Sequence, residues 1–446
     1  MPGSEALLVD LYELTMADAY RRQGLAERPA TFSLFVRELP PGRSCLVAAG
    51  IDDVLDWLER LSFGPEEIAG LERLGLLSRE LLELLAGLRF TGTVRAVPEG
   101  TIVFPNEPIL EVDAPILQAQ LAETYLLNQI TLQTALATTA ARCREAAAGR
   151  AVVDFALRRT PGTDAGMKLA RVAGLVGLAG TSNVAGALRY GLPASGTMAH
   201  SFVQAFANET DAFRAYAALF GPRTVLLVDT YDTRQGVEHA ITVAREARAR
   251  GVELAGIRID SGDLGALARA AREALDAAGF PNLQIVVSGG LDEHAIARLV
   301  ASGAPIDAFG VGASLALPRE APSLDTAYKL VEIDGRPVRK TSPGKESWPG
   351  RKQVWRARDW SEDVLALASE PPPGAGHVPL LVEVMRDGRR TEAGRRTLAE
   401  ARAHFASQWA ELPTALRRLD GAGKHPVRIS PALAAAARAL AAARDA

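Results

Sequence analysis

From residue 224 onward, short apolar runs rich in β-branched residues alternate with stretches whose apolar positions recur at helical spacing. The apolar runs predict strands at residues 224–229, 253–259, 283–288 and 306–311. The stretches between them predict helices at 235–250, 264–278 and 292–301, and an earlier pair starts the same pattern at 152–157 and 165–176. Strands that alternate with helices form parallel sheets. We therefore expect an α/β fold, most economically a barrel of βα units spanning residues 131–330.

The segments on either side of this region have a different pattern. Residues 93–112 are interrupted by Pro98, Gly100, Pro105 and Pro108, which suits short antiparallel strands better than buried parallel ones. Asp334 and Gly335 separate two strand-like runs, as in a β-hairpin. A further strand is predicted at 380–384, and a terminal helix at 432–446. We expect residues 1–130 and 331–446 to form one discontinuous α+β domain.

Composition places the chain among ordinary globular proteins. Hydrophobic residues make up 48% and charged residues 23%, and Lys+Arg 50 against Asp+Glu 53 gives a formal charge of -3. The chain therefore has no overall excess of positive charge of the kind that binds nucleic acid or an anionic membrane. Two cysteines, Cys45 and Cys143, cannot form a disulfide framework or a four-cysteine zinc site. Because no signal peptide or long apolar run is evident, we expect a cytoplasmic protein.

Polar residues collect where the predicted parallel strands end, which is where βα barrels carry their chemistry. Arg158 follows the first strand, Asp229 the second, and Arg258, Asp260 and Asp263 lie in or after the third. The arginines suit carboxylate or phosphate oxygens, or simply pair with neighbouring carboxylates. The carboxylates suit ribose hydroxyls, or Mg²⁺ bound through water and phosphate groups.

Two glycine-rich turns follow the last two predicted strands. They are Ser288-Gly289-Gly290 and Gly310-Val311-Gly312. Backbone N–H groups in such turns form a concave anion site, although glycine is also common in tight βα loops. Because the last two strands are where barrels usually bind a phosphomonoester, we interpret both turns as phosphate-binding.

His200 lies in a loop of small and hydroxyl-bearing residues, Ser195-Gly196-Thr197-Met198-Ala199-His200-Ser201. A lone histidine is often structural, so this loop leaves a structural and a catalytic role open. The sequence lacks G-x-S-x-G, H-E-x-x-H and G-x-x-x-x-G-K-[ST], which disfavours the common serine hydrolases, zinc proteases and P-loop proteins.

Several motifs occur in the order found in nicotinate phosphoribosyltransferase, which the chain resembles over residues 8–355. They are Asp10-Leu11-Tyr12-Glu13-Leu14-Thr15-Met16, Phe155-Ala156-Leu157-Arg158-Arg159, Gly180-Thr181-Ser182-Asn183-Val184, the His200 loop through Phe202, Val228-Asp229-Thr230-Tyr231-Asp232 and Arg258-Ile259-Asp260-Ser261-Gly262-Asp263-Leu264, followed by Ser288, Phe309-Gly310-Val311-Gly312 and Tyr328-Lys329-Leu330-Val331. An ordered set of motifs is far more specific than any one of them.

The resemblance implies the fold of type II phosphoribosyltransferases, an irregular α/β barrel beside an α+β domain, and a homodimer. It implies condensation of nicotinate with phosphoribosyl diphosphate to give nicotinate mononucleotide and diphosphate, in NAD biosynthesis or salvage. ATP hydrolysis is coupled to this reaction in the family, and Mg²⁺ is required. The expected partners are therefore these small molecules, with no nucleic acid and no membrane.

The resemblance also implies residue roles. Tyr12, Thr197 and Arg258 would line the nicotinate pocket. The catalytic candidates are His200, which matches the histidine that the family phosphorylates, with Arg158 and Asp260. Asp260 and Asp263 are also candidate Mg²⁺ ligands through water. The residues expected to hold phosphate or ribose are Asp229, Asp263, Ser288, Gly289, Gly290, Gly310 and Gly312.

One departure from the family and two alternatives bear on these expectations. Ala313 and Leu317 stand where the family commonly has threonines near the phosphate. Backbone N–H groups and Ser314 are expected to compensate. The alternatives are a sister phosphoribosyltransferase using nicotinamide or quinolinate, and an inactive barrel that binds nucleotides. Nicotinamide lacks the charge that Arg258 would pair, and quinolinate, with two carboxylates, calls for a denser basic pocket.

Overall fold

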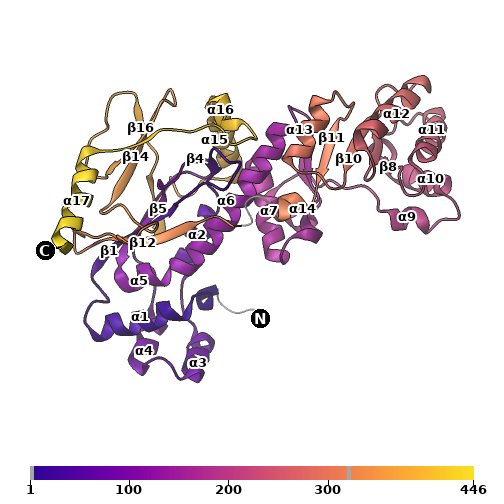
Figure 1. The fold of residues 1–446 in the computed structure, drawn as a ribbon. Helices are drawn as coiled ribbons and strands as arrows, with labels where there is room; N and C mark the ends of the chain where they lie inside the picture. The colour runs from indigo at the N-terminus through magenta and orange to yellow at the C-terminus, as the bar shows by residue number, and fades with distance from the viewer. Residues whose placement is uncertain (1–4, 319–322, 446) are drawn as a thin grey trace. The chain divides into compact units, whose positions relative to one another are not determined.

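The computed structural model describes residues 5–318 and 323–445. The chain folds into two compact units, one made of Met1–Thr138 with Glu320–Ala446 and the other of Thr139–Arg319 (Figure 1). The first unit is thus built from both ends of the sequence. In the part of the chain described, no helix is both long and apolar enough to cross a membrane.

A seven-stranded sheet forms the centre of the first unit, and its neighbouring strands are all antiparallel. Its order is β13 (Arg336–Pro337), β12 (Thr326–Ile333), β1 (Pro29–Val36), β5 (Pro108–Pro115), β3 (Thr93–Ala96), β17 (Val382–Arg386) and β18 (Arg389–Arg390). The antiparallel strands predicted within 93–112 and the hairpin at Asp334-Gly335 are confirmed. Both hairpin residues have positive φ, which suits the tight turn.

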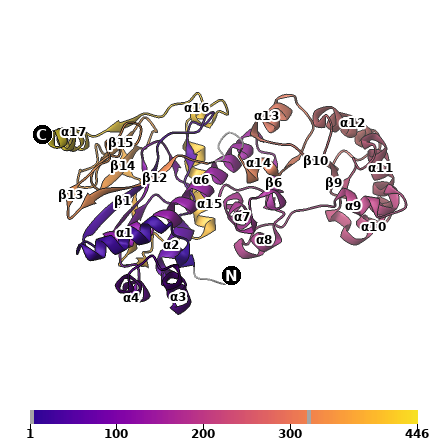
Figure 2. The ribbon, with the colours of Figure 1, turned by 60° about the horizontal axis from the view of Figure 1, so that its bottom comes forward.

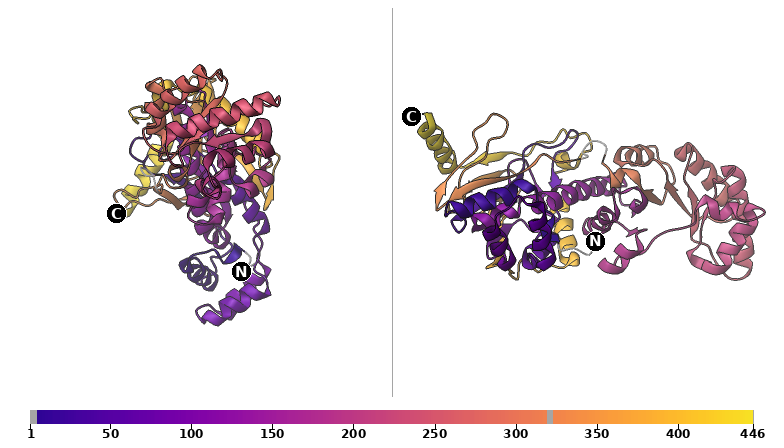
Figure 3. Two further views of the ribbon diagram at one scale, coloured as in Figure 1. Left: turned by 90° about the vertical axis from the view of Figure 1, so that its right-hand side faces the viewer. Right: turned by 90° about the horizontal axis from the view of Figure 1, so that it is seen from below.

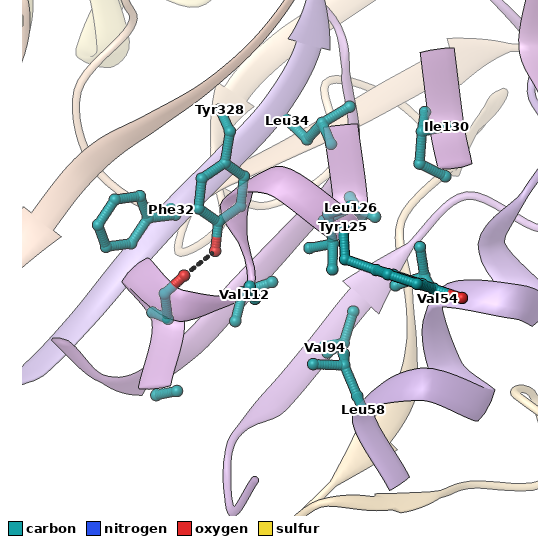
Figure 4. Packing of buried hydrophobic residues seen from close by; sticks show 14 of the residues in the cluster. Phe32, Leu34, Val54, Leu58, Val94, Val112, Tyr125, Leu126, Ile130 and Tyr328 are labelled. Atoms are coloured by element: carbon teal, nitrogen blue, oxygen red, sulfur yellow. Dashed lines mark hydrogen bonds between the residues drawn. The ribbon is translucent and has the colours of Figure 1, made fainter. Parts of the chain in front are cut away.

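Helices contribute side chains to a large hydrophobic cluster that they share with this sheet. They are η1 (Glu5–Leu7), α1 (Leu11–Arg22), α2 (Ile51–Arg60), α3 (Pro65–Leu74), α4 (Arg79–Gly87), α5 (Ile116–Leu121) and α6 (Glu123–Ala146). Figure 4 shows Tyr328 of β12 beside Phe32 of β1, with ring centroids 4.8 Å apart. The Tyr328 hydroxyl donates a hydrogen bond to the Ala119 carbonyl at 2.9 Å, so this buried polar group is satisfied.

A four-stranded sheet and the C-terminal helices complete the first unit. The strands run in the order β16 (His377–Pro379), β14 (Lys352–Ala357), β15 (Asp363–Leu367) and β19 (Val427–Ile429), and a small ribbon pairs β2 (Leu46–Val47) with β4 (Ile102–Val103). The helices are α15 (Leu398–Glu411), α16 (Thr414–Arg417) and α17 (Pro431–Asp445). The predicted terminal helix is confirmed as α17, which packs against β15 and is yellow in Figure 3.

The second unit contains a six-stranded parallel sheet. Its order is β7 (Gly180–Thr181), β6 (Ala151–Asp154), β11 (Ala308–Val311), β10 (Gln284–Ser288), β9 (Gly256–Ile259) and β8 (Val225–Leu227). Its helices are η2 (Leu157–Arg159), α7 (Thr163–Leu175), α8 (Val184–Tyr190), α9 (His200–Gln204), α10 (Glu209–Phe220), η3 (Gly221–Arg223), α11 (Thr233–Ala249), α12 (Leu264–Ala277), α13 (Glu293–Ala301) and α14 (Ala313–Ala316). Every strand and helix predicted from residue 152 to 311 is present, and α11 and α12 pack against the sheet (Figure 2).

The structure supports the α/β class without confirming the barrel. The paired strands of the second unit form an open order, with β7 and β8 at its two ends. Barrel closure depends on pairing between distant strands, which periodicity along the chain does not report. The sheet pairing also places Thr326–Ile333 in the first unit, although the barrel was expected to extend to residue 330, because this strand pairs with β1.

Candidate active site

Polar side chains from neighbouring strands meet at the carboxyl edge of the parallel sheet. Asp229 follows β8, Asp260 follows β9, and Ser288 ends β10, and these strands are hydrogen-bonded neighbours. The carboxyl ends of parallel strands lie at one edge, and ligands of open α/β sheets and barrels bind there. The structure therefore brings these three predicted site residues together.

A hydrogen-bond network connects the three residues. One oxygen of Asp229, Oδ2, accepts from the Asp260 backbone N–H at 3.0 Å and from the Ser261 hydroxyl at 2.6 Å. The Ser288 hydroxyl donates to Oδ1 of Asp260. The other oxygen of Asp229, Oδ1, is buried and has no hydrogen-bond partner in the described part of the chain. The network therefore orders the loops after β8, β9 and β10 and leaves one carboxylate oxygen available.

The glycine turn after β10 depends on close backbone approach. Gly289 has φ +87°, and a Cβ there would lie 1.8 Å from the Asp260 carbonyl oxygen. Gly290 has φ +65°, but a Cβ there would meet nothing within 4 Å. Both glycines suit the positive-φ turn, and Gly289 in addition lets the turn lie against Asp260. The turn is thus joined to the same site.

The second glycine turn has a different physical basis from the first. A Cβ on Gly310 would lie 2.5 Å from the Phe155 ring, so this glycine makes room for an aromatic side chain. Gly312 precedes α14 and would tolerate a Cβ at 3.6 Å from the Phe155 carbonyl. Ala313 begins α14, Ser314 is buried within it, and the Leu317 side chain that follows is 51% exposed.

Arg258, on β9, points its guanidinium toward the His200 loop. One terminal nitrogen, Nη1, donates to the Thr197 hydroxyl, which joins two residues expected in the nicotinate pocket. The Nε atom is buried and has no hydrogen-bond partner among the described residues. Burial lowers the pKa of Arg258, Asp260 and Asp229 oppose that shift, and Arg158 adds to it. The group stays cationic, so its free donor suits an anionic ligand.

His200 begins α9 at the end of its loop. Its Nδ1 lies 3.2 Å from the Thr230 hydroxyl, and its Nε2 lies 4.0 Å from Oδ2 of Asp260. The His200 side chain is 40% exposed, so the ring is open to a ligand. The structure thus places His200 beside the network of Asp229, Asp260 and Ser288.

Two predicted site residues have other surroundings. Asp263 is the N-cap of α12, and its Oδ1 accepts from the Ala266 backbone N–H at 3.0 Å. Asp263 therefore acts as a helix cap, which is a common role for aspartate. Arg158 lies in η2, is exposed, and makes no hydrogen bond or ion pair with the residues that the structure describes. Its influence on the pKa of Arg258 nevertheless places it within electrostatic range of the pocket.

Tyr12 lies in the first unit, on α1. Its side chain is 44% exposed, and its hydroxyl is hydrogen-bonded to Glu123. Burial raises the pKa of the Tyr12 hydroxyl, and the carboxylates of Glu123, Glu13 and Asp10 raise it further. Tyr12 therefore stays neutral at physiological pH and remains a hydrogen-bond donor.

Three residues near the site were not singled out by sequence reasoning. Thr230 contacts His200, Phe155 packs against Gly310, and Tyr216 on α10 interacts electrostatically with Arg258. Thr230 and Phe155 lie within quoted motifs, so motif membership was the available signal for them. Tyr216 lies in an amphipathic helix, where nothing in the pattern separates it from a packing residue.

The site offers oxygen ligands without a preformed metal cage. In the described residues, no group of three or more His, Cys, Asp or Glu side chains could hold a metal ion. Mg²⁺ usually binds through one or two carboxylates, water and substrate phosphates, so it does not need such a cage. The Asp260 side chain is 33% exposed and its Oδ2 lies 4.0 Å from Nε2 of His200, so this carboxylate is accessible for that kind of binding.

Comparison with family models matches nearly the whole chain. A model described as the nicotinate phosphoribosyltransferase N-terminal domain matches residues 7–131, and one described as the nicotinate phosphoribosyltransferase family matches residues 151–366. A model of the C-terminal domain of the same enzymes matches residues 375–436. The three matches follow the order of the chain.

Individual proteins agree with the family models. A nicotinate phosphoribosyltransferase of Mycobacterium tuberculosis is 50% identical over 429 residues, covering 95% of this chain and 91% of its own length. One from Bacillus subtilis is 42% identical over 380 residues, covering 82% and 77%. The crystal structure of human nicotinic acid phosphoribosyltransferase has a TM-score of 0.86 at 30% identity and covers 97% of this chain and 99% of that one. The chain belongs to the nicotinate phosphoribosyltransferase family.

Proposed function

We propose that this protein transfers the phosphoribosyl group of phosphoribosyl diphosphate to nicotinate, forming nicotinate mononucleotide and diphosphate for NAD biosynthesis or salvage. Family membership supports the reaction class. The observation that carries the choice of substrate is Arg258, whose buried Nε has no partner among the described residues while Nη1 donates to Thr197. A pyridine carboxylate would satisfy this donor with a charge-assisted hydrogen bond, worth about 1.5 to 3 kcal/mol.

The transfer depends on correct positioning of the nucleophile and does not need a general base. The pyridine nitrogen of nicotinate attacks C1 of the ribose, and the C1–O bond to diphosphate breaks with its electron pair. Positive charge develops on the ribose ring in the transition state, so fixed geometry and nearby carboxylates favour the reaction. The pyridine nitrogen is already unprotonated at neutral pH. Arg258 and Thr197 would orient nicotinate.

Phosphate groups would be held by the turn after β10 and by Arg158. Gly289 and Gly290 offer backbone N–H groups beside Ser288, and the exposed Arg158 guanidinium lacks a competing partner in the described structure. Asp229 suits the ribose hydroxyls because its buried Oδ1 has no hydrogen-bond partner in the part of the chain that the structure describes. Gly310 and Gly312 would complete the ribosyl phosphate site with Ser314. Mg²⁺ would neutralise the diphosphate leaving group, with Asp260 binding it through water.

ATP hydrolysis would be coupled to transfer through His200. The ring is partly exposed beside Asp260 and can accept a phosphoryl group. Phosphorylation affects transfer only if the phosphorylated and unphosphorylated states differ in their affinity for substrate or product. A tenfold tightening requires about 1.4 kcal/mol of differential binding.

The architecture of the working enzyme is part of the same proposal. The six-stranded parallel sheet would form the wall of an irregular barrel, as its βα units suggest. The functional protein would be a cytoplasmic homodimer. Sedimentation velocity of the purified protein would measure the subunit number directly.

Product formation tests the proposed function. The purified protein is incubated with phosphoribosyl diphosphate and Mg²⁺ plus nicotinate, nicotinamide or quinolinate, with and without ATP. Mass spectrometry of the nucleotide and assay of diphosphate should give equal amounts of nicotinate mononucleotide and diphosphate. A preference for either other pyridine would assign the chain to a sister activity. Nucleotide binding without any product would favour an inactive binding protein.

A further inference from the structure

The two ring nitrogens of His200 have different surroundings. Nδ1 lies 3.2 Å from Oγ1 of Thr230, which is a hydrogen-bond distance. Nε2 lies 4.0 Å from Oδ2 of Asp260, which is beyond hydrogen-bond range. A phosphoryl group cannot enter between Nδ1 and Thr230 unless one of the two side chains moves. Nε2 is therefore the ring nitrogen that has no hydrogen-bond partner among the described residues.

Thr230 is held in place by its chain neighbour. Asp229 accepts hydrogen bonds from the Asp260 backbone and the Ser261 hydroxyl, which fastens the segment after β8 to the loop after β9. Threonine is also β-branched, which restricts its side-chain rotamers. The Thr230 hydroxyl is therefore a fixed contact for His200.

We propose that Thr230 is a positioning residue that directs phosphoryl transfer from ATP to Nε2 of His200, an inference that rests on the phosphorylation proposed above. The Nε2 lone pair attacks the γ-phosphorus, and an Nε2–P bond forms. The bond from that phosphorus to the β,γ-bridging oxygen breaks, and ADP leaves with the electron pair. The Nδ1 proton stays on the ring and is donated to Oγ1 of Thr230.

The hydroxyl of Thr230 acts through the tautomer of His200. A neutral imidazole carries one N–H and one lone pair, so Nε2 is nucleophilic only when the proton is on Nδ1. The carboxylate of Asp260 would favour a proton on Nε2, and a cation held beside Asp260 would offset that preference. An acceptor beside Nδ1 favours the reactive tautomer and the positive charge that the ring gains on attack. Loss of this acceptor should slow phosphorylation about tenfold.

The test follows the site and rate of phosphorylation in protein labelled with ¹⁵N-histidine. Wild type, Thr230→Val, Thr230→Ser and Thr230→Ala are incubated with Mg²⁺ and ATP, and ³¹P and ¹⁵N spectra identify the modified nitrogen. Thr242→Val on α11 serves as the control, because Thr242 is exposed and its hydroxyl donates to the Glu238 carbonyl of the same helix. Transfer to nicotinate without ATP is measured on the same preparations.

Wild type and Thr230→Ser should be phosphorylated on Nε2, and Thr230→Val should react about tenfold more slowly. Thr230→Ala uncovers Nδ1, so part of its phosphate should be found on Nδ1. Wild-type phosphate on Nδ1, or Thr230→Val and Thr230→Ala both reacting on Nε2 at the wild-type rate, overturns the inference and leaves the proposed function standing. Wild type that transfers phosphoribosyl groups but forms no phosphohistidine contradicts both the ATP coupling and this inference. Wild type without any transfer contradicts the proposed function itself.

Discussion

Two buried polar atoms at the edge of the parallel sheet lack partners among the described residues, Nε of Arg258 and Oδ1 of Asp229. Another nitrogen of Arg258, Nη1, donates to the Thr197 hydroxyl. The other carboxylate oxygen of Asp229, Oδ2, accepts from the Asp260 backbone N–H and the Ser261 hydroxyl. Leaving a buried polar group unsatisfied costs about 1 to 3 kcal/mol, more if it is charged. A ligand that pairs with both groups recovers that cost on binding, because their orientation is already set.

Replacing His200 by asparagine should separate ATP use from phosphoribosyl transfer. His200→Asn removes the phosphoryl acceptor and leaves Arg258, Asp229 and the glycine turn unchanged. ATP hydrolysis should be abolished, and slow ATP-independent formation of nicotinate mononucleotide should remain. The measurement is ADP release and nucleotide formation in parallel, with His294→Asn on α13 as the control. Full ATP stimulation in His200→Asn would show that the histidine is structural.

At the residue scale, sequence reasoning depended on motifs and strand ends. It named Asp229, Arg258, Asp260 and Ser288, which the structure brings to one edge of the sheet. It could not foresee that Asp263 caps α12, because a cap and a ligand-binding aspartate after a strand have the same local pattern. The role inferred for Thr230 depends on one distance between side chains 30 residues apart.

At the element scale, the turn after β10 is the most sharply constrained feature of the site. Gly289 and Gly290 both have positive φ, but only at Gly289 would a Cβ collide with the Asp260 carbonyl. Glycine at both positions thus fits the backbone conformation, while Gly289 also sets the spacing between β9 and β10. The second glycine turn, by contrast, is shaped by the Phe155 ring.

Alanine at these two glycines should therefore have unequal effects. Gly290→Ala should cost about 1 kcal/mol of unfolding free energy, since the added methyl group only strains the backbone. Gly289→Ala should cost more and lower kcat/KM for phosphoribosyl diphosphate, because Asp260 must move. Urea unfolding and steady-state kinetics measure both quantities. Equal losses at the two positions would contradict the role of close approach.

Element types and order were largely predictable from periodicity. The βα units from residue 152 to 311 have clear alternation, and prolines and glycines mark the antiparallel strands of the first unit. Short strands such as β7, with only two residues, have no pattern long enough to detect. The loop carrying His200 lacks periodicity and was noticed through its small and hydroxyl-bearing residues, whereas the role of its histidine was implied by the resemblance alone.

At the scale of the whole molecule, the first unit is closed by contacts between distant parts of the chain. Glu13 of α1 is fully buried, and its Oε1 accepts from the backbone N–H of Thr124 at 2.8 Å and from its hydroxyl at 2.6 Å. Burial raises the pKa of Glu13 to about 7, although the Thr124 hydrogen bonds oppose the shift. The Tyr12 motif therefore contains a carboxyl group that titrates near neutral pH.

The raised pKa makes the stability of the first unit depend on pH. Between about pH 4.5 and 7, folded Glu13 keeps its proton while the unfolded chain loses it, so stability falls as pH rises and levels off above pH 7. Glu13→Gln should thus be more stable than wild type at pH 8, by about 1 to 3 kcal/mol, with little difference at pH 5. Thermal unfolding between pH 5 and pH 8 measures this difference in stability, with exposed Glu72→Gln as the control. A pH-independent difference would contradict the shift.

The division into two units and the closure of the sheet were the least predictable features. Sequence patterns indicated that both chain ends share a domain, but strand pairing decided that Thr326–Ile333 joins β1. The strand order β7-β6-β11-β10-β9-β8 likewise depends on contacts that local alternation does not encode. The alternation of strands and helices led to the barrel expectation and the family resemblance agreed with it, but the described pairings establish only the parallel sheet.

The discrimination between nicotinate and nicotinamide tests the central claim most directly. The specificity constant kcat/KM is measured for both pyridines in wild type, Arg258→Gln and Arg258→Lys, with exposed Arg250→Gln as the control. Wild type and Arg250→Gln should prefer the acid at least about tenfold, which corresponds to about 1.4 kcal/mol for the carboxylate contact. Arg258→Gln should lose this preference, and Arg258→Lys should retain part of it because charge remains without the planar fork. Equal constants for acid and amide in wild type, or an unchanged preference in Arg258→Gln, would contradict the account.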